Sequence, residues 1–286
     1  MKGMIYTPEL PEVENVKLSL KNKIIGHEVI AAYVSVPKII KSPSNSKQFC
    51  EQIAGLTFKN LERRGKFLIA EMSNDFYLVG HLGMTGLLMV SPNRQKEDLP
   101  EKYRNHIHVI MALDDTSFFV FSDIRRFGSL RLLTKEQLDN LPSLKGMGPE
   151  PFDDDVEIKF LKSLKKKKWL DKTIKEAIMD QSVIAGIGNI YASEILYKSG
   201  IMPNRLIIEL SEDNLRTVLH FSKDILQTSI DLGGTSVSDY LNSEGKKGNY
   251  QNYLSVYGKT KCPCGHDIQT EIIKGRNTFY CSICQG

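Results

Sequence analysis

The spacing of apolar residues divides the chain into regions of different predicted structure. Val13, Val16 and Leu20 recur at helical spacing, and Pro11 before them suits a first helical turn, so a helix is predicted near the N-terminus. From about residue 28 to 133, short apolar runs alternate with turn residues. This texture is typical of strands and predicts a β-rich first domain, a sandwich.

Individual strands can be placed within this region. Residues 107 to 113 alternate apolar and other side chains, and Asp114 and Asp115 are expected to turn the chain into the next strand. The predicted strands cover residues 28–34, 66–72, 76–80, 107–113 and 118–121.

A segment rich in helix and strand breakers follows. Gly146, Gly148, Pro149 and Pro151 lie within residues 146–155, so this segment is predicted to be a linker. Beyond it the apolar spacing becomes helical. Helices are predicted over residues 156–168, 172–181, 188–199 and 211–232.

The last predicted helix carries clear signals at both ends. Ser211 is suited to its N-cap, and Gly233 with Gly234 is expected to end it. The C-terminal residues 259–286 are interpreted as a hairpin with cysteines at its ends. The expected domains are therefore residues 1–145, 146–255 and 256–286.

Composition narrows the class of protein. The chain has 286 residues, 41% apolar content and a formal net charge of +4, which is ordinary for a globular protein of two domains. No signal peptide is expected, and no run of about 18 apolar residues indicates a transmembrane helix. Most of the cysteines lie near the C-terminus, which favours a metal site over disulfides and indicates a cytosolic location.

The cysteine spacing predicts a zinc site. Sixteen residues separate Cys264 from Cys281. Cys281 and Cys284 form a knuckle with two residues between them. The first knuckle departs from this spacing, because only Pro263 separates Cys262 from Cys264. The predicted ligands of one structural zinc are Cys262, Cys264, Cys281 and Cys284, with His266 as the alternative to Cys262.

Several stretches resemble one known family. Residues Pro8 to Glu14, PELPEVE, closely resemble the opening of the formamidopyrimidine-DNA glycosylases, bacterial enzymes that excise oxidised purines. Gly186 to Glu194 resembles their helix–two-turn–helix element, and residues 274–281 resemble their zinc-finger turn. The resemblance covers nearly the whole chain. It implies an α+β fold with an N-terminal β-sandwich domain and flanking helix, a helical helix–two-turn–helix domain and a C-terminal zinc-finger hairpin.

The same resemblance assigns catalytic roles. The amine of Pro8 would attack C1′ of the damaged nucleotide, and Glu9 would handle protons at the sugar. Lys66 would reach the phosphates flanking the lesion and assist elimination. Arg276 would contact the DNA backbone beside the damaged nucleotide, because its fork geometry suits phosphate.

Further residues are assigned to DNA binding. When a base is flipped out of the duplex, side chains must fill the hole and meet the orphaned partner. By resemblance, Met84, Arg125 and Phe127 take this role, although without the resemblance Met84 and Phe127 would be interpreted as core residues. His106 matches a DNA-contacting histidine, and Asn189 adds a donor at a helix start that offers N–H groups to phosphate.

Two basic stretches support binding to nucleic acid. Residues 159–175 hold eight lysines, and residues 245–261 combine lysines with tyrosines. They are interpreted as phosphate-neutralising surfaces. The second stretch, preceded by Gly233, Gly234 and Thr235, resembles the loop that folds over a flipped oxidised purine, which favours the formamidopyrimidine branch over the endonuclease VIII branch.

One feature of the sequence conflicts with the family's chemistry. Seven residues precede Pro8, and while they stay attached its nitrogen is a tertiary amide without a usable lone pair. A misassigned start or proteolytic trimming would restore the amine. Otherwise Glu9 could activate water in a monofunctional glycosylase, or the protein could bind lesions without cutting. Lys2 or Lys66 is a further candidate amine.

The predicted function is a base-excision repair glycosylase that flips out and removes 8-oxoguanine and formamidopyrimidines, with its AP-lyase step in question. Its expected partner is double-stranded DNA containing a damaged base, bound by a monomer in the bacterial cytoplasm at the nucleoid. The alternatives are a non-catalytic damaged-DNA binding protein and, less favoured, a zinc-ribbon RNA-binding protein.

Overall fold

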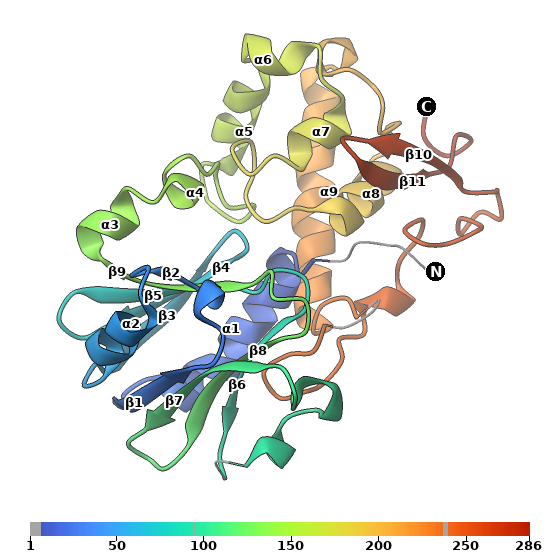
Figure 1. The fold of residues 1–286 in the computed structure, drawn as a ribbon. Coiled ribbons are helices and arrows are strands. Elements are labelled where there is room, and N and C mark those ends of the chain that lie inside the picture. The colour runs from blue at the N-terminus through green and yellow to red at the C-terminus, as the bar shows by residue number, and fades with distance from the viewer. Residues whose placement is uncertain (1–6, 94, 237–239) are drawn as a thin grey trace. The chain divides into compact units, whose positions relative to one another are not determined.

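The computed structural model describes residues 7–93, 95–236 and 240–286 (Figure 1). Contacts divide these residues into two compact units. The sandwich unit comprises residues 7–145 together with the segment 233–248. The helical unit comprises residues 146–232 and 249–286. The segment 233–248 therefore belongs to the N-terminal unit. The sequence pattern does not reveal this long-range association.

Two β-sheets build the sandwich unit (Figure 1). One is antiparallel in the order β1-β7-β8-β6, with β1 Val29–Val34, β6 Gly86–Ser91, β7 Ile107–Leu113 and β8 Phe118–Asp123. The other has the order β2-β9-β5-β4-β3, with β2 Ile40–Ser42, β3 Phe58–Arg64, β4 Phe67–Met72, β5 Phe76–His81 and β9 Ser129–Thr134. In this sheet β2 pairs with β9 in parallel, and the other pairs are antiparallel.

Helices and 3-10 turns complete this unit. Asn45 caps α2 because its side chain accepts hydrogen bonds from the N–H groups of Lys47 and Gln48. The α-helices are α1 Leu10–Ile24, α2 Ser46–Ile53, α3 Lys135–Asp139 and α4 Pro142–Lys145. The 3-10 turns are η1 Pro37–Ile39, η2 Lys96–Asp98 and η3 Glu101–Tyr103.

The predicted strand pattern is reproduced where alternation was strong. In β7, Val109, Met111 and Leu113 are fully buried, as the alternation predicts, and a turn at Asp114 leads into β8. The five predicted strands correspond to β1, β4, β5, β7 and β8. The remaining four strands of the two sheets were not individually predicted.

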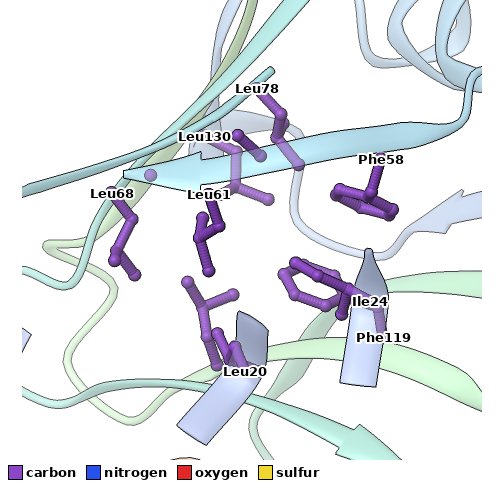
Figure 2. A pocket seen from close by; sticks show the side chains of 11 residues that line it. Leu20, Ile24, Phe58, Leu61, Leu68, Leu78, Phe119 and Leu130 are labelled. Atoms are coloured by element: carbon purple, nitrogen blue, oxygen red, sulfur yellow. The ribbon is translucent and has the colours of Figure 1, made fainter. Parts of the chain in front are cut away.

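Helix α1 supplies the centre of the sandwich core. Leu20 and Ile24 project from α1 toward side chains of both sheets, including Phe58 and Phe119 (Figure 2). The side chains enclose a cavity of about 20 Å³. It is large enough for one water molecule, but its lining offers no polar side chain, so it is expected to stay dry. The lining residues are Leu20, Ile24, Phe58, Leu61, Leu68, Ala70, Leu78, Gly80, Leu88, Phe119 and Leu130.

Filling this cavity should stabilise the protein. A Cβ atom on Gly80, in β5, would lie 3.5 Å from the nearest atoms of Leu88 and Leu130, which is ordinary van der Waals contact. We expect Gly80→Ala to raise the unfolding free energy by about 0.5–1 kcal/mol, since it also restricts the unfolded chain. Gly83→Ala is the matched opposite, because Gly83 has φ +63° and its Cβ would lie 2.5 Å from the Gly128 nitrogen. Chemical denaturation should show opposite shifts; a loss of stability in Gly80→Ala would contradict the packing described.

The helical unit consists of short helices around one long helix and a C-terminal hairpin. Helix α9, Glu212–Asp231, begins after Ser211, whose side chain accepts the N–H of Asn214, and ends before Gly233 and Gly234. The other α-helices are α5 Val156–Leu164, α6 Lys167–Leu170, α7 Ile174–Ile178 and α8 Asn189–Lys198. The remaining elements are η4 Ile207–Glu209, η5 Tyr250–Asn252, β10 Gln269–Ile273 and β11 Arg276–Tyr280.

Two of the predicted helices are shorter in the structure. The one predicted over 156–168 is interrupted at Lys166, whose extended backbone separates α5 from α6. The one predicted over 172–181 is reduced to α7, after which Gln181 bonds to a loop instead of extending the helix. No helix within the described ranges is long and apolar enough to span a bilayer.

Candidate active site and metal centre

The start of α1 holds two of the predicted catalytic residues in a fixed conformation. Pro8 and Glu9 are both buried, and Glu9 occupies the N-cap position. The Glu9 N–H donates to Oε2 of Glu12 at 2.8 Å, which satisfies a donor that the helix itself cannot pair. The backbone at Glu9 is therefore fixed by a side chain one turn along the same helix.

Glu12 also fastens the segment 233–248 to α1. Its Oε1 accepts the Thr235 N–H at 2.7 Å, and its carbonyl oxygen accepts the Tyr240 hydroxyl at 3.1 Å. Burial, followed by the negative charge of Glu12, raises the pKa of Tyr240, so the hydroxyl stays a donor. Glycine is favoured at position 234, because its φ is +86° and a Cβ would lie 3.0 Å from Oε1 of Glu12. Glu12 thus links the backbone of Glu9 to a segment more than 200 residues away.

The turn that carries Lys66 is attached to the same helix. Lys66 follows Gly65 in the tight turn between β3 and β4. The Arg63 guanidinium donates to Oε2 of Glu14 at 2.8 Å and to the Gly65 carbonyl oxygen at 3.1 Å. Arg63 and Glu14 are both largely buried, so this pair is not subject to the solvent screening that makes exposed ion pairs weak. It fixes the Lys66 turn against α1.

A buried carboxylate joins the two loops that carry the predicted void-filling residues. Asp123 is fully buried, and its Oδ1 accepts the Thr85 hydroxyl at 2.5 Å. The Thr85 oxygen in turn accepts the Arg125 N–H at 2.9 Å. Oδ2 of Asp123 accepts the Gly128 N–H at 2.7 Å. The loop before β6 and the loop after β8 are therefore held together by hydrogen bonds to charged and polar oxygens.

These loops present their side chains outward. Phe127 is 58% exposed, and the Arg125 guanidinium lies 5.1 Å from the centre of its ring, within the range of a cation–π contact. Met84 is partly exposed at the tip of the other loop. Core packing, the alternative interpretation, does not account for the exposure of Phe127. The structure brings Met84, Arg125 and Phe127 together on the two joined loops.

His81 is hydrogen-bonded to the loop that carries Met84. Its Nδ1 accepts the Gly83 N–H at 3.1 Å, which places its proton on Nε2, and its ring packs 4.8 Å from the ring of Phe67. Burial, helped by the positive charges of Lys66 and Arg131, lowers the pKa of His81 to about 4. The imidazole is therefore neutral at physiological pH and can keep accepting this bond.

The lowered pKa of His81 predicts a pH dependence of stability. The ordinary value is 6.5 and the value in the fold is about 4, so the unfolded chain takes up a proton between these limits that the fold does not. The stabilisation is present above pH 6.5 and is lost as pH falls to 4, by an amount on the order of 3 kcal/mol. His81→Gln should flatten this part of the stability profile, whereas the exposed His220→Gln should not. Equal slopes in thermal melts of both variants across this range would contradict the assignment.

The two histidines at the start of β7 have different environments. His106 is partly exposed, and its carbonyl oxygen accepts the Asp123 N–H at 3.0 Å, which places it beside the joined loops. His108 is buried and its Nε2 bonds to the Asp123 carbonyl oxygen at 2.7 Å. His108 is a core residue, and His106 remains available at the surface.

In the helical unit, the turn before α8 is organised by one glutamine. The Gln181 side chain accepts the Gly186 N–H at 2.8 Å and donates to the Ile187 carbonyl oxygen at 2.9 Å. Gly186 has φ +86°, a conformation that favours glycine. Gly188 then serves as N-cap, and α8 begins at Asn189.

Asn189 connects α8 to the C-terminal hairpin. Its Nδ2 donates to the Asn277 carbonyl oxygen at 2.9 Å, next to Arg276 at the start of β11. Arg276 is partly exposed, and no carboxylate of the described residues forms an ion pair with it. The structure therefore brings Asn189 and Arg276 together at one surface of the helical unit.

Two buried charged residues hold this surface in place. The Lys175 side chain is fully buried and donates to the Thr278 hydroxyl at 2.7 Å, beneath β11. The Glu194 carboxylate accepts the N–H groups of Ser255, Val256 and Tyr257 at 2.7–3.0 Å. Burial raises the pKa of Glu194, although these three N–H groups act in the opposite direction. Neither structural role is predicted by the local sequence around Lys175 or Glu194.

The basic stretches are only partly available for binding. Lys175 is internal to the fold, which removes it from the predicted basic surface. Lys159 pairs with Asp155, and Lys165 pairs with Glu212. These pairs are exposed and therefore weak, so a phosphate could displace them at little cost.

Four residues at the C-terminus form a group that could hold a metal ion. The donor atoms of Cys262, His266, Cys281 and Cys284 all lie within 4.8 Å of one another. Burial opposes ionisation of Cys262, but the N–H groups of His266 and Cys264 and the neighbouring thiols lower its pKa to about 6. Thiolate and imidazole donors suit a borderline-soft metal ion. The predicted ligand Cys264 is exposed and lies outside this group.

Comparison with known proteins agrees with these features. The model of the formamidopyrimidine-DNA glycosylase N-terminal domain matches residues 7–130, and that of the corresponding H2TH domain matches residues 147–240. The Bacillus cereus formamidopyrimidine-DNA glycosylase is 36% identical over 282 residues, covering 97% of this chain and 99% of the relative. The Carboxydothermus hydrogenoformans enzyme is 38% identical over 281 residues, covering 97% and 99%.

Solved structures extend the likeness to the fold. A Lactococcus lactis FPG variant in complex with Fapy-dG-containing DNA has a TM-score of 0.85 and 34% identity, covering 97% of this chain and 99% of that one. The match to a complex of the L. lactis protein with abasic-site DNA also covers 97% of this chain and 99% of that one. The α+β fold, the joined loops and the helix–two-turn–helix region together define a DNA glycosylase of base-excision repair. The chain belongs to the formamidopyrimidine-DNA glycosylase family.

Proposed function

We propose that this glycosylase excises oxidised purines, namely 8-oxoguanine and formamidopyrimidines, from double-stranded DNA. The observation that supports this most directly is the pair of loops joined through Asp123, which present Met84, Arg125 and the exposed Phe127. An apolar side chain, a planar cation and an aromatic ring can fill the space left by a flipped base and contact its partner. The L. lactis relative was crystallised with Fapy-dG-containing DNA, which supports the substrate class.

The bond to the damaged base is broken by attack at C1′ of its sugar. In the proposed mechanism Glu9 accepts and donates protons at the sugar. The base departs with the electron pair of the glycosidic bond. The attacking group depends on the Thr7–Pro8 peptide bond. While that bond is intact, we assign the attack to a water molecule whose proton Glu9 accepts. When Pro8 is the first residue, its secondary amine attacks C1′ as the base departs. Opening of the C1′–O4′ bond then gives an iminium ion, and loss of sugar protons permits elimination of the flanking phosphates.

Contacts to phosphate position the duplex for this step. We assign these contacts to Lys66 and His106 in the sandwich unit and to Asn189 and Arg276 in the helical unit. The α8 N-terminus, Asn189, favours anions because it is the positive end of the helix dipole. These roles are consistent with three functional regions at residues 1–145, 146–255 and 256–286. We further infer that a monomer acts on the bacterial nucleoid in the cytoplasm.

A direct assay separates this proposal from its alternative. The alternative, which applies while the Thr7–Pro8 bond is intact, is a protein that binds damaged DNA without cutting it. We expect a duplex with a single 8-oxoguanine to release free base, measured by mass spectrometry, whereas an undamaged duplex should release none. Glu9→Gln should abolish release while preserving binding. Tight lesion-specific binding without base release would favour the non-catalytic alternative.

The metal at the C-terminal group is, we propose, a single structural zinc ion. The ion would hold the residues that flank the β10–β11 hairpin, which carries Arg276. It would supply folding free energy to a segment too small for a core of its own. Because the donors are thiolates and imidazole and the role is structural, we assign no step of the reaction to it.

Removal of the metal should weaken DNA binding through Arg276. After chelation we expect the affinity for duplex containing an abasic-site analogue to fall at least about tenfold, since an Arg–phosphate contact is charge-assisted. Fluorescence anisotropy should show recovery when zinc is restored. In Arg276→Ala the affinity should be low from the start and chelation should change it little. If chelation reduced the DNA affinity of the unmodified protein and of Arg276→Ala equally, the metal would not act through Arg276, and the prediction would be wrong.

A further inference from the structure

We propose that the metal is held by Cys262, Cys281, Cys284 and the imidazole of His266, and that Cys264 is a free surface thiol. This inference rests on the proposed metal-binding role of the C-terminal group. It differs from the four-cysteine set that the sequence spacing predicts. It concerns which side chains the short first knuckle directs to the ion.

The backbone of the first knuckle explains this choice of ligand. The Cys262 N–H donates to the His266 carbonyl oxygen at 2.9 Å, and Lys261 forms an antiparallel bridge with Asp267. Cys262 and His266 are therefore opposite each other across a tight turn. Residues opposite each other on antiparallel strands point their side chains to the same face. Cys264 lies at the tip of this turn, before Gly265, whose φ is +84°.

Two distances between donor atoms match the edges of a tetrahedral site. Sγ of Cys262 lies 3.8 Å from Sγ of Cys284, and Nδ1 of His266 lies 3.5 Å from the same sulfur. With Zn–S bonds of about 2.3 Å and a Zn–N bond of about 2.0–2.1 Å, a tetrahedron has an S–S edge of about 3.8 Å and an S–N edge of about 3.5 Å. Both separations therefore suit a shared ion, and every other pair of donor atoms in the group lies within 4.8 Å.

Cys264 does not fit into this arrangement. It is exposed, whereas Cys262 and Cys281 are buried and His266 and Cys284 are partly buried. Its thiol is a neighbour of Cys284 but does not share the mutual separation that unites the four donors. With one residue between the cysteines, the turn presents Cys262 inward and Cys264 outward. A site with three thiolates carries one negative charge less than a site with four.

X-ray absorption on the zinc-loaded full-length protein tests the ligand set without relying on activity. We expect three sulfur scatterers at about 2.3 Å and one nitrogen at about 2.0–2.1 Å. Cys264→Ala should leave the spectrum and the zinc content unchanged. His266→Ala should remove the nitrogen scatterer and weaken zinc binding in competition with a chelator. Four sulfur scatterers, lost in Cys264→Ala, would overturn the ligand assignment alone, whereas absence of bound zinc in the unmodified protein would overturn the metal proposal itself.

Thiol labelling provides a second measurement on the same protein. In the zinc-loaded state, an alkylating reagent should modify Cys264 without releasing zinc, and peptide mass spectrometry should find Cys262, Cys281 and Cys284 protected. Cys50 is partly exposed and serves as an internal reference for a thiol outside the site. Chelation should make all four C-terminal cysteines reactive. Protection of Cys264 by zinc would show that it is a ligand and would overturn the proposal.

Discussion

The intact chain should give no covalent adduct when borohydride is added during its reaction with 8-oxoguanine duplex. A borohydride-trapped adduct requires an imine or an iminium ion, and either one requires an amine with a free lone pair. While Thr7 is joined to Pro8, that lone pair belongs to a peptide bond. A shortened chain whose first residue is Pro8 should form the adduct and cut the strand, with a rate of strand cleavage at least about a thousandfold higher.

The site of any adduct discriminates between explanations. If the intact chain is trapped, digestion and mass spectrometry identify the residue attached to the sugar. Attachment at Lys66, abolished by Lys66→Gln, would assign the chemistry to a different amine. Attachment at Pro8 in a chain that retains Thr7 would contradict the conclusion that the amide nitrogen of Pro8 cannot attack. Base release without trapping in the intact chain, together with trapping in the shortened one, is the expected pair of results.

The sequence alone predicted the family and the α+β fold, and both are confirmed. Local pattern was sufficient where one face of an element is buried, as in β7 with Val109, Met111 and Leu113. It was insufficient for β6, where every residue is buried. There Leu88 faces the cavity between the sheets, while Leu87 and Met89 pack under Tyr103 and Leu241. A strand buried on both faces has no alternation to detect.

The structural supports of the site could not be predicted for a different reason. Glu12, Asp123 and Glu194 are acidic residues, which are usually solvated or serve as helix-dipole partners. Each is instead buried, and each accepts N–H groups from segments distant in sequence or in loops. Nothing in the local sequence encodes which backbone groups will lack a partner after folding. The assignments of Pro8, Lys66 and the DNA-contacting residues rest on resemblance and stay predictions.

Replacing Asp123 should disable the void-filling loops. Asp123→Asn keeps the shape but directs an amide N–H₂ group at either the Thr85 hydroxyl or the Gly128 N–H, and it removes the charge from three hydrogen bonds. Losing a buried, charge-assisted network costs about 2–4 kcal/mol of stability. We expect base excision to fall at least about a hundredfold, because Met84 and Arg125 lose their common support.

Matched variants separate loop support from general loss of folding. Thr85→Ser keeps the hydroxyl that bridges Asp123 to the Arg125 N–H and should retain most activity, whereas Thr85→Val should lose it with a smaller loss of stability than Asp123→Asn. Asp139→Asn, on exposed α3, should change neither property. Each variant is compared at a temperature where circular dichroism shows it fully folded. Normal excision by folded Asp123→Asn would mean that Met84, Arg125 and Phe127 reach the duplex without the buried carboxylate, so that the joined loops are not what positions them.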